Sequence, residues 1–90
     1  MEYIYRLHAI ERMFQRDIDE RHVEEVIENG EIIETYVDDK PYPSFLVLGY
    51  SDNLPLHVVY AKDDEGNVIV ITAYRPNTNK WEDDLKTRKA

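Results

Sequence analysis

Three apolar stretches rich in β-branched residues follow one another in the second half of the chain. They are SFLVLGYS at residues 44–51, PLHVVYAK at residues 55–62 and VIVITAYR at residues 68–75. DNL lies between the first two and DDEGN between the last two, and both breaks are short enough for tight hairpins. Strands joined by such turns pair antiparallel, so these stretches predict a sheet at the centre of the fold.

The first thirty residues have the period of helices rather than strands. Four apolar side chains recur at helical spacing and predict a stripe that faces the core: Leu7, Ile10, Phe14 and Ile18. A second helix is expected to begin near Asp19, a good N-cap residue, and to end at Gly30. The N-terminal third therefore predicts two short helices in succession.

Two further segments complete the predicted fold. EIIETYV at residues 31–37 has mixed polarity and is expected to be an edge strand, while KWEDDLKTRK at residues 80–89 could form a short C-terminal helix. The prediction is a single domain over residues 1–90 of the α+β class. Its two N-terminal helices would pack on one face of a four-stranded antiparallel meander sheet, followed by the short C-terminal helix.

Composition excludes several classes of protein. The chain has no cysteine, so neither a disulfide framework nor a zinc ribbon is available. The longest apolar run, FLVLGY, is far too short to cross a bilayer, and the N-terminus lacks the apolar region of a signal peptide. We therefore expect a cytoplasmic protein with no membrane partner.

Charge is unevenly distributed along the chain. The formal net charge is −8, and residues 17–40 alone, with ten acidic residues against Arg21 and Lys40, carry the same net charge. An acidic chain has little general affinity for nucleic acid, because Lys and Arg drive phosphate binding. The acidic segment could instead bind a basic protein partner.

A few basic residues are nevertheless spaced as if they act together. His8, Arg12 and Arg16 lie four apart and share one stripe of the first predicted helix, where like charges repel. If the last hairpin turns at Glu65, three pairs oppose each other across it: Tyr60 with Val70, Val58 with Thr72 and Leu56 with Tyr74. In that register His57 and Arg75 share one face of the hairpin. The small and branched side chains of this face suit a helix-covered core, and the first helix could deliver His8 and Arg12 to the same end.

Histidine and arginine at one sheet end suit an anionic transition state. Cleaving RNA through its own 2′-hydroxyl needs a base, an acid and cations around the phosphorus, and these side chains supply all three without a metal. HxxxH and HExxH spacings are absent, so no metal site is predicted. Simpler roles stay open: His57 as a core histidine, Arg12 and Arg16 as partners of the acidic segment, and Trp81 as a core side chain.

Several segments also carry a family resemblance that spans about His8 to Lys89: LHAIERMFQRDIDERHVEEVIENGEIIETY, KPYPSFLVLG, PLHVVYA, VITAYRP and WEDDLKTRK. They resemble a small prokaryotic family known as domain of unknown function 4258. The hairpin LHVVYAKDDEGNVIVITAYRP is similar to that of BrnT-type toxins, and the layout resembles the RelE/ParE superfamily. The family pattern falls on His8, Arg12, Arg16, His57, Thr72, Tyr74 and Trp81, with Arg75 adjacent to it.

The resemblance implies a metal-independent endoribonuclease of a toxin–antitoxin system, with RNA as substrate, a basic antitoxin as partner and no cofactor. In this hypothesis His8 and His57 divide the acid and base roles, Arg12 holds the phosphate and Tyr74 orients a nucleotide. The substrate-binding residues would be Arg16, Thr72 and Arg75. Two other hypotheses are a non-catalytic interaction module whose acidic helix holds a basic partner, and a protein that binds a small anionic metabolite.

Overall fold

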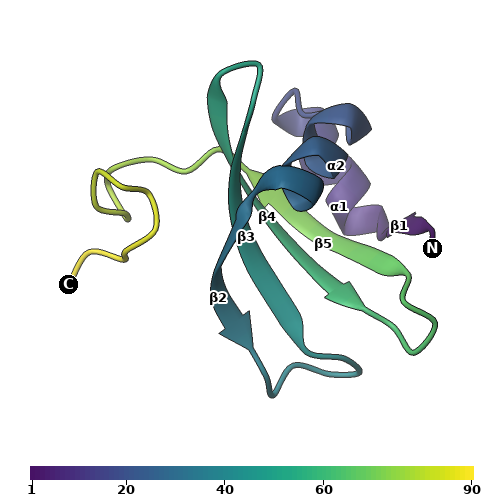
Figure 1. The fold of residues 1–90 in the computed structure, drawn as a ribbon. Coiled ribbons are helices and arrows are strands. Elements are labelled where there is room, and N and C mark those ends of the chain that lie inside the picture. Colours follow the sequence, from purple (N-terminus) through teal and green to yellow (C-terminus); the bar gives the residue numbers. More distant parts are fainter.

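The computed structural model describes residues 1–90 and contains two helices and five strands (Figure 1). In chain order the elements are β1 (Tyr3–Tyr5), α1 (Leu7–Gln15), α2 (Glu20–Asn29), β2 (Glu31–Tyr36), β3 (Ser44–Ser51), β4 (Leu54–Lys62) and β5 (Val68–Tyr74). Both helices cover one face of the sheet, and the C-terminal segment, residues 76–90, runs to the other side of it. The α+β class is thus as predicted, but the sheet is different.

The sheet has five strands in the order β1-β5-β4-β3-β2 and is mixed, so the prediction of a four-stranded antiparallel meander is wrong. The additional strand, β1, pairs parallel to β5, with Tyr3 opposite Val68. The Val68 amide donates to the Glu2 carbonyl at 2.8 Å, and the Arg6 amide donates to the Val70 carbonyl at 3.3 Å. Three residues are too few to show a strand's alternation, so only these distant partners define β1.

The predicted C-terminal helix is also absent. Residues 76–90 contain no helix, and an isolated bridge pairs Trp81 with Arg88. The Asp84 side chain accepts hydrogen bonds from the amides of Lys86 and Thr87, at 2.9 and 3.0 Å, and Leu85 has a φ of 59°. Local side-chain hydrogen bonds of this kind compete with a helix and bend the chain into a turn.

The predicted boundaries of α2 are confirmed. The Asp19 side chain accepts from the His22 amide at 3.1 Å, and the His22 ring accepts from the Asp19 amide at 3.1 Å, so both form a capping box. Gly30 follows the last residue of α2, and a Cβ there would lie 2.5 Å from the Val26 carbonyl oxygen and 2.6 Å from that of Leu48. Only glycine allows the helix end to approach β3 so closely.

The face that α1 turns towards the core is not the predicted one. Ala9 and Met13 are buried, whereas Leu7, Ile10 and Phe14 are 67%, 50% and 87% exposed. The small Ala9 side chain, with no exposed surface, lets α1 lie close against the sheet. Of the four residues in the predicted buried stripe, only Ile18, after the helix, is buried.

A bulge in β5 changes the predicted register of the last hairpin. Tyr60 pairs with Val70 as predicted, but Val59 pairs with Thr72, so Ile71 has no direct partner. From there on the pairs are shifted by one residue, and His57 lies opposite Tyr74. The predicted pairs of Val58 with Thr72 and Leu56 with Tyr74 are therefore wrong.

The faces of the sheet are also the reverse of those predicted for β4. Leu56, Val58 and Tyr60 belong to the core cluster beneath the helices, together with Ala9, Met13, Val23 and Val26. His57 alternates with Leu56 and Val58, so it lies on the opposite face, where the C-terminal segment covers it. This placement decides which residues can form a site.

Candidate anion-binding site

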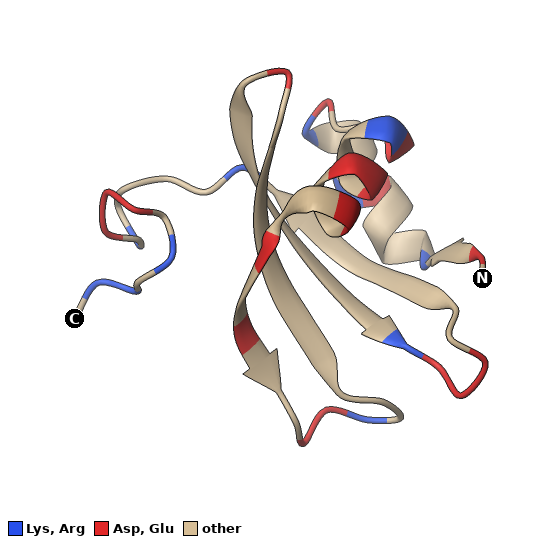
Figure 2. Cartoon of the chain, in the orientation of Figure 1, with Lys and Arg blue, Asp and Glu red and all other residues tan.

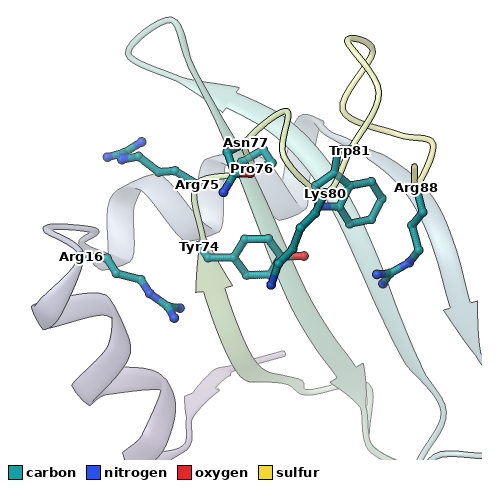
Figure 3. Close-up of a pocket in the computed structure, with 8 residues that line it drawn as sticks. All are labelled: Arg16, Tyr74, Arg75, Pro76, Asn77, Lys80, Trp81 and Arg88. Atoms are coloured by element: carbon teal, nitrogen blue, oxygen red, sulfur yellow. The ribbon is translucent and has the colours of Figure 1, made fainter. Parts of the chain in front are cut away.

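A pocket of about 610 Å³ lies at the carboxyl end of β5, between the end of α1 and the C-terminal segment (Figure 3). We call it the cationic pocket. Its lining consists of Arg16, Tyr74, Arg75, Pro76, Asn77, Lys80, Trp81 and Arg88. Four of these eight side chains are cationic and none is acidic. Tyr74 lies in the middle, with Arg16 on one side and Trp81 and Arg88 on the other.

Arg16 connects the end of α1 to the end of β5. Its Nη1 atom donates to the carbonyl oxygen of Ala73 at 2.9 Å. A cation is favourable at this position because the carbonyl groups at a helix C-terminus carry partial negative charge. The hydrogen bond therefore fixes the Arg16 guanidinium beside Tyr74 without using a carboxylate.

The His57 ring forms a hydrogen bond with the Tyr74 hydroxyl. The His57 side chain is fully buried; its Nδ1 atom lies 3.1 Å from the Tyr74 hydroxyl and its Nε2 atom 2.8 Å from the Leu85 carbonyl oxygen. A carbonyl only accepts, so Nε2 carries the proton and Nδ1 accepts from the Tyr74 hydroxyl. Burial lowers the pKa of His57, which favours this neutral form, and burial also raises the pKa of Tyr74.

The Trp81 ring packs against the His57 ring. The two rings meet edge to face, with centroids 4.6 Å apart and planes at 89°, and Trp81 is almost completely buried. The Cζ atom of Arg88 lies 4.6 Å from the centroid of the indole ring, a cation–π distance. These contacts hold the C-terminal segment against the sheet.

Arg88 is the only pocket cation that has a carboxylate partner. Its Nε and Nη2 atoms donate to the two oxygens of Glu34 at 2.9 and 3.0 Å, and Glu34 also accepts from the Tyr36 hydroxyl. The guanidinium lowers the pKa of Glu34, which keeps this carboxylate ionised. A guanidinium has five N–H groups, so three of those on Arg88 remain available to a ligand.

The other three cations of the pocket are not neutralised. Arg16, Arg75 and Lys80 form no salt bridge, and Arg75 and Lys80 make no side-chain hydrogen bond. The chain has only 11 Lys and Arg residues and a net charge of −8, so three unpaired cations around one pocket are unexpected. Such an arrangement can hold an anion with several oxygen atoms.

The structure brings only part of the predicted site together. Arg16, Tyr74 and Arg75 line the pocket, and His57 lies directly behind Tyr74. Thr72 is half-buried in β5 and does not line the pocket.

His8 and Arg12 are exposed on α1, form no hydrogen bond or salt bridge with their side chains, and do not reach the pocket. The predicted convergence of His8 and Arg12 with His57 fails because His57 lies on the face opposite the helices.

Sequence reasoning gave no role to Lys80 or Arg88, and it assigned Trp81 to the core and to the family pattern but not to the site. The sequence does place a cation, Lys80, directly before Trp81 and a second cation, Arg88, seven residues after it. This pattern was missed because a helix was expected there, and a helix would not return Arg88 to the Trp81 ring. In the structure, the isolated bridge between Trp81 and Arg88 folds the chain back, so that the Arg88 side chain lies over the Trp81 ring.

The remaining polar groups do not suggest a metal centre. No three His, Asp or Glu side chains lie close enough together to hold a metal ion. Neither helix is long and apolar enough to cross a membrane.

The fold and the pocket define a small α+β domain with a pocket lined by four cationic side chains at one end of its sheet. The family model described as "Domain of unknown function (DUF4258)" matches residues 5–75, and the chain belongs to this family. Residues 76–90, which supply Lys80, Trp81 and Arg88, lie beyond the matched range. Neither the search of curated proteins nor the search of solved structures found a match.

Proposed function

We propose that this protein is a metal-independent endoribonuclease of the toxin type, acting on RNA at the cationic pocket. The observation that carries the proposal is the gathering of four cations, and no acid, around one pocket of an otherwise acidic chain. The resemblance of the hairpin to BrnT-type toxins, and of the layout to the RelE/ParE superfamily, supports RNA as the anion.

Binding would be local rather than spread over the surface. Arg16, Arg75 and Lys80 have no carboxylate partners, so a phosphate diester could take their free donors. The rest of the chain repels a polyanion, because its net charge is strongly negative. The substrate would therefore be a short single-stranded segment that fits one or two nucleotides into the pocket.

The proposed chemistry uses the Tyr74–His57 pair as a proton relay. The 2′-oxygen attacks the adjacent phosphorus while its proton passes to the Tyr74 oxygen and the Tyr74 proton passes to Nδ1 of His57. The bond from phosphorus to the 5′-oxygen breaks, and this oxygen takes a proton from the Lys80 ammonium. The products are a 2′,3′-cyclic phosphate and a 5′-hydroxyl, and solvent exchange restores both groups.

The neutral state of His57 is what makes it an acceptor. Its Nε2 proton is held by the Leu85 carbonyl, which leaves the Nδ1 lone pair directed at Tyr74. In the transition state, the arginines would stabilise the charge on the non-bridging oxygens. Tyr74 and Lys80 would be the catalytic residues, and His57 acts through Tyr74.

The test is cleavage of a labelled single-stranded RNA in the presence of a chelator, with detection of the cyclic phosphate. Tyr74→Phe keeps the ring and removes the relay, and it should lower the cleavage rate about 100-fold or more. Arg75→Ala should lower the rate about tenfold or more. Arg12→Ala is the matched control: it removes an exposed arginine outside the pocket and should change nothing.

A dependence on added divalent metal would overturn the proposal, as would equal effects of the Arg75 and Arg12 substitutions. Full activity of Tyr74→Phe would exclude the proposed proton relay through Tyr74 and His57.

A second candidate is the binding of a small phosphorylated molecule without cleavage. It is favoured by the packing of His57, which is fully buried between Trp81 and the sheet and is costly to protonate there. The volume of about 610 Å³ suits a molecule of nucleotide size. Calorimetric titration with a mononucleotide that shows binding lost in Arg75→Ala, with no RNA cleavage by the native protein, would favour this candidate.

A further inference from the structure

The most exposed large apolar side chain of the molecule, Phe14, lies on α1 and is not part of the lining of the cationic pocket. Leu7, Ile10 and Phe14 follow one another at helical spacing, and Phe14 is 87% exposed. We call these three residues the apolar stripe. Burying a phenylalanine side chain is favourable, so three large apolar side chains left in water on one helix face mark a surface with another use.

A groove lies beside this stripe, where α1 meets the beginning of α2. Five of its eight lining residues are hydrophobic: Tyr5, Ile10, Met13, Phe14 and Ile18. Asp19, Glu20 and Arg21 form the rim on the side of α2. The lining of the groove therefore combines apolar side chains with three charged residues at the beginning of α2.

The charge of that edge is acidic along the whole of α2. A second, shallow hollow shares Glu20 and Arg21 with the groove and is also lined by Glu24, Glu25 and Glu28. Figure 2 shows acidic positions along α2. Glu24 and Glu28 accept hydrogen bonds from the hydroxyls of Tyr5 and Tyr3. The only cation near any of the four acids is Arg21, 3.8 Å from Glu25.

We propose that the apolar stripe and the acidic side of α2 together dock a basic amphipathic helix from a partner protein. Apolar side chains of that helix would fill the groove beside Phe14, and its Lys or Arg side chains would meet the acids of α2. This is recognition of an amphipathic helix by an apolar groove with a complementary charged rim. The proposal does not depend on any activity of the cationic pocket.

Charge separates this occupant from the two obvious alternatives. A second copy of the chain would bring its own acidic α2 and a net charge of −8 to the contact, which opposes association through this edge. An anionic lipid surface would be repelled by the same acids. A basic helix is attracted by them.

The experiment titrates the whole protein into a fluorescently labelled peptide of about five helical turns, built from Leu and Lys at amphipathic spacing. The comparison peptide has Glu in place of every Lys. The basic peptide should bind at least about tenfold more tightly than the acidic one, and added salt should weaken its binding.

Single substitutions test whether the peptide binds to the proposed surface. Phe14→Ser should weaken binding of the basic peptide about tenfold or more, because an aromatic anchor at the centre of an interface contributes most of the affinity. Val37→Ser is the matched control: Val37 is also apolar and 68% exposed but lies after β2, away from the groove, and its loss should change nothing. Glu20→Gln should weaken binding severalfold and reduce its dependence on salt.

Three results would overturn the proposal. Equal binding of the two peptides, or no binding of either, would exclude charge-guided helix docking. A dimer in solution that Phe14→Ser dissociates would identify a second copy as the occupant, and binding to phosphatidylserine vesicles in preference to the peptide would identify a membrane. Arg75→Ala should leave peptide binding intact, so failure here and failure of the proposed ribonuclease are distinguishable.

Discussion

The cationic pocket and the apolar stripe both contain aromatic side chains, but they are attached to the fold in different ways. In the pocket, Tyr74 and Trp81 contact the fully buried His57, and Arg88 is held by Glu34. On α1, Phe14 is 87% exposed, and the helix is anchored by Ala9 and Met13 instead. The pocket should therefore be coupled to folding stability, whereas the stripe should be dispensable for it.

The largest expected effect contrasts one aromatic residue from each region. Trp81→Ala should lower the free energy of unfolding by about 3–5 kcal/mol, because it removes a buried indole and frees the C-terminal segment. Phe14→Ala should change that free energy by no more than about 0.5 kcal/mol. Denaturation in urea measures both, and similar losses in the two variants would contradict the comparison.

The second effect is a pH dependence that belongs to the pocket alone. Burial lowers the pKa of His57 in the folded protein below its ordinary value of 6.5, so the unfolded chain binds more protons between those two values. Stability should fall as the pH drops below about 6.5, by at most about 1.4 kcal/mol per pH unit from this group, and level off below the folded-state pKa.

Urea denaturation between pH 5 and 8 on His57→Gln supplies the control for this effect. The variant should be less stable overall but should lack this part of the pH dependence, because it has no buried imidazole. His8 and His22 are present in both proteins and do not distinguish them. Parallel pH profiles of the native and variant proteins would show that His57 does not titrate as described.

A smaller effect is expected at the rim of the pocket. Arg88→Ala should lower the free energy of unfolding by about 0.5–1 kcal/mol, because its bidentate contact with Glu34 is partly exposed to solvent and is therefore weakened by water. Glu34→Gln should have an effect of similar size. Calorimetric melting tests both, and a loss as large as that of Trp81→Ala would mean that the ion pair, not the indole, holds the C-terminal segment.

The smallest effect leaves stability unchanged and is seen only in binding. Arg75→Ala removes one unpaired cation of the pocket, so the slope of log affinity against log salt for single-stranded RNA should decrease by about 0.7. Arg12→Ala removes an exposed cation of α1 and should leave the slope unchanged. Equal changes in both variants would mean that RNA binds to the general surface and not to the pocket.

Much of the fold was predictable, because the signals for it are local. The Asp19 cap, the end of α2 at Gly30 and the strands β3, β4 and β5 follow from short-range preferences that the tertiary structure does not override. Only part of the site was found in the sequence. Arg16, Tyr74 and Arg75 were identified, but their predicted partners, His8 and Arg12, do not lie with them.

The errors have a common physical origin in long-range contacts. The bulge at Ile71 shifts the register by one residue and so exchanges the faces of the last part of β5, which brings Tyr74 opposite His57. Hydrophobic period alone could not show which side of α1 packs on the sheet, because Ala9 allows a closer approach than the larger Ile10 or Phe14 would.

The sequence by itself determined where the helices and the three long strands lie, since capping, turn chemistry and alternation act between residues close in the chain. The tertiary structure alone decided that β1 joins β5, that His57 faces the C-terminal segment and that Lys80 and Arg88 meet Arg16 and Tyr74. Those contacts join residues far apart in the chain, and their geometry depends on a bulge and a turn whose effects appear only when the whole sheet is assembled.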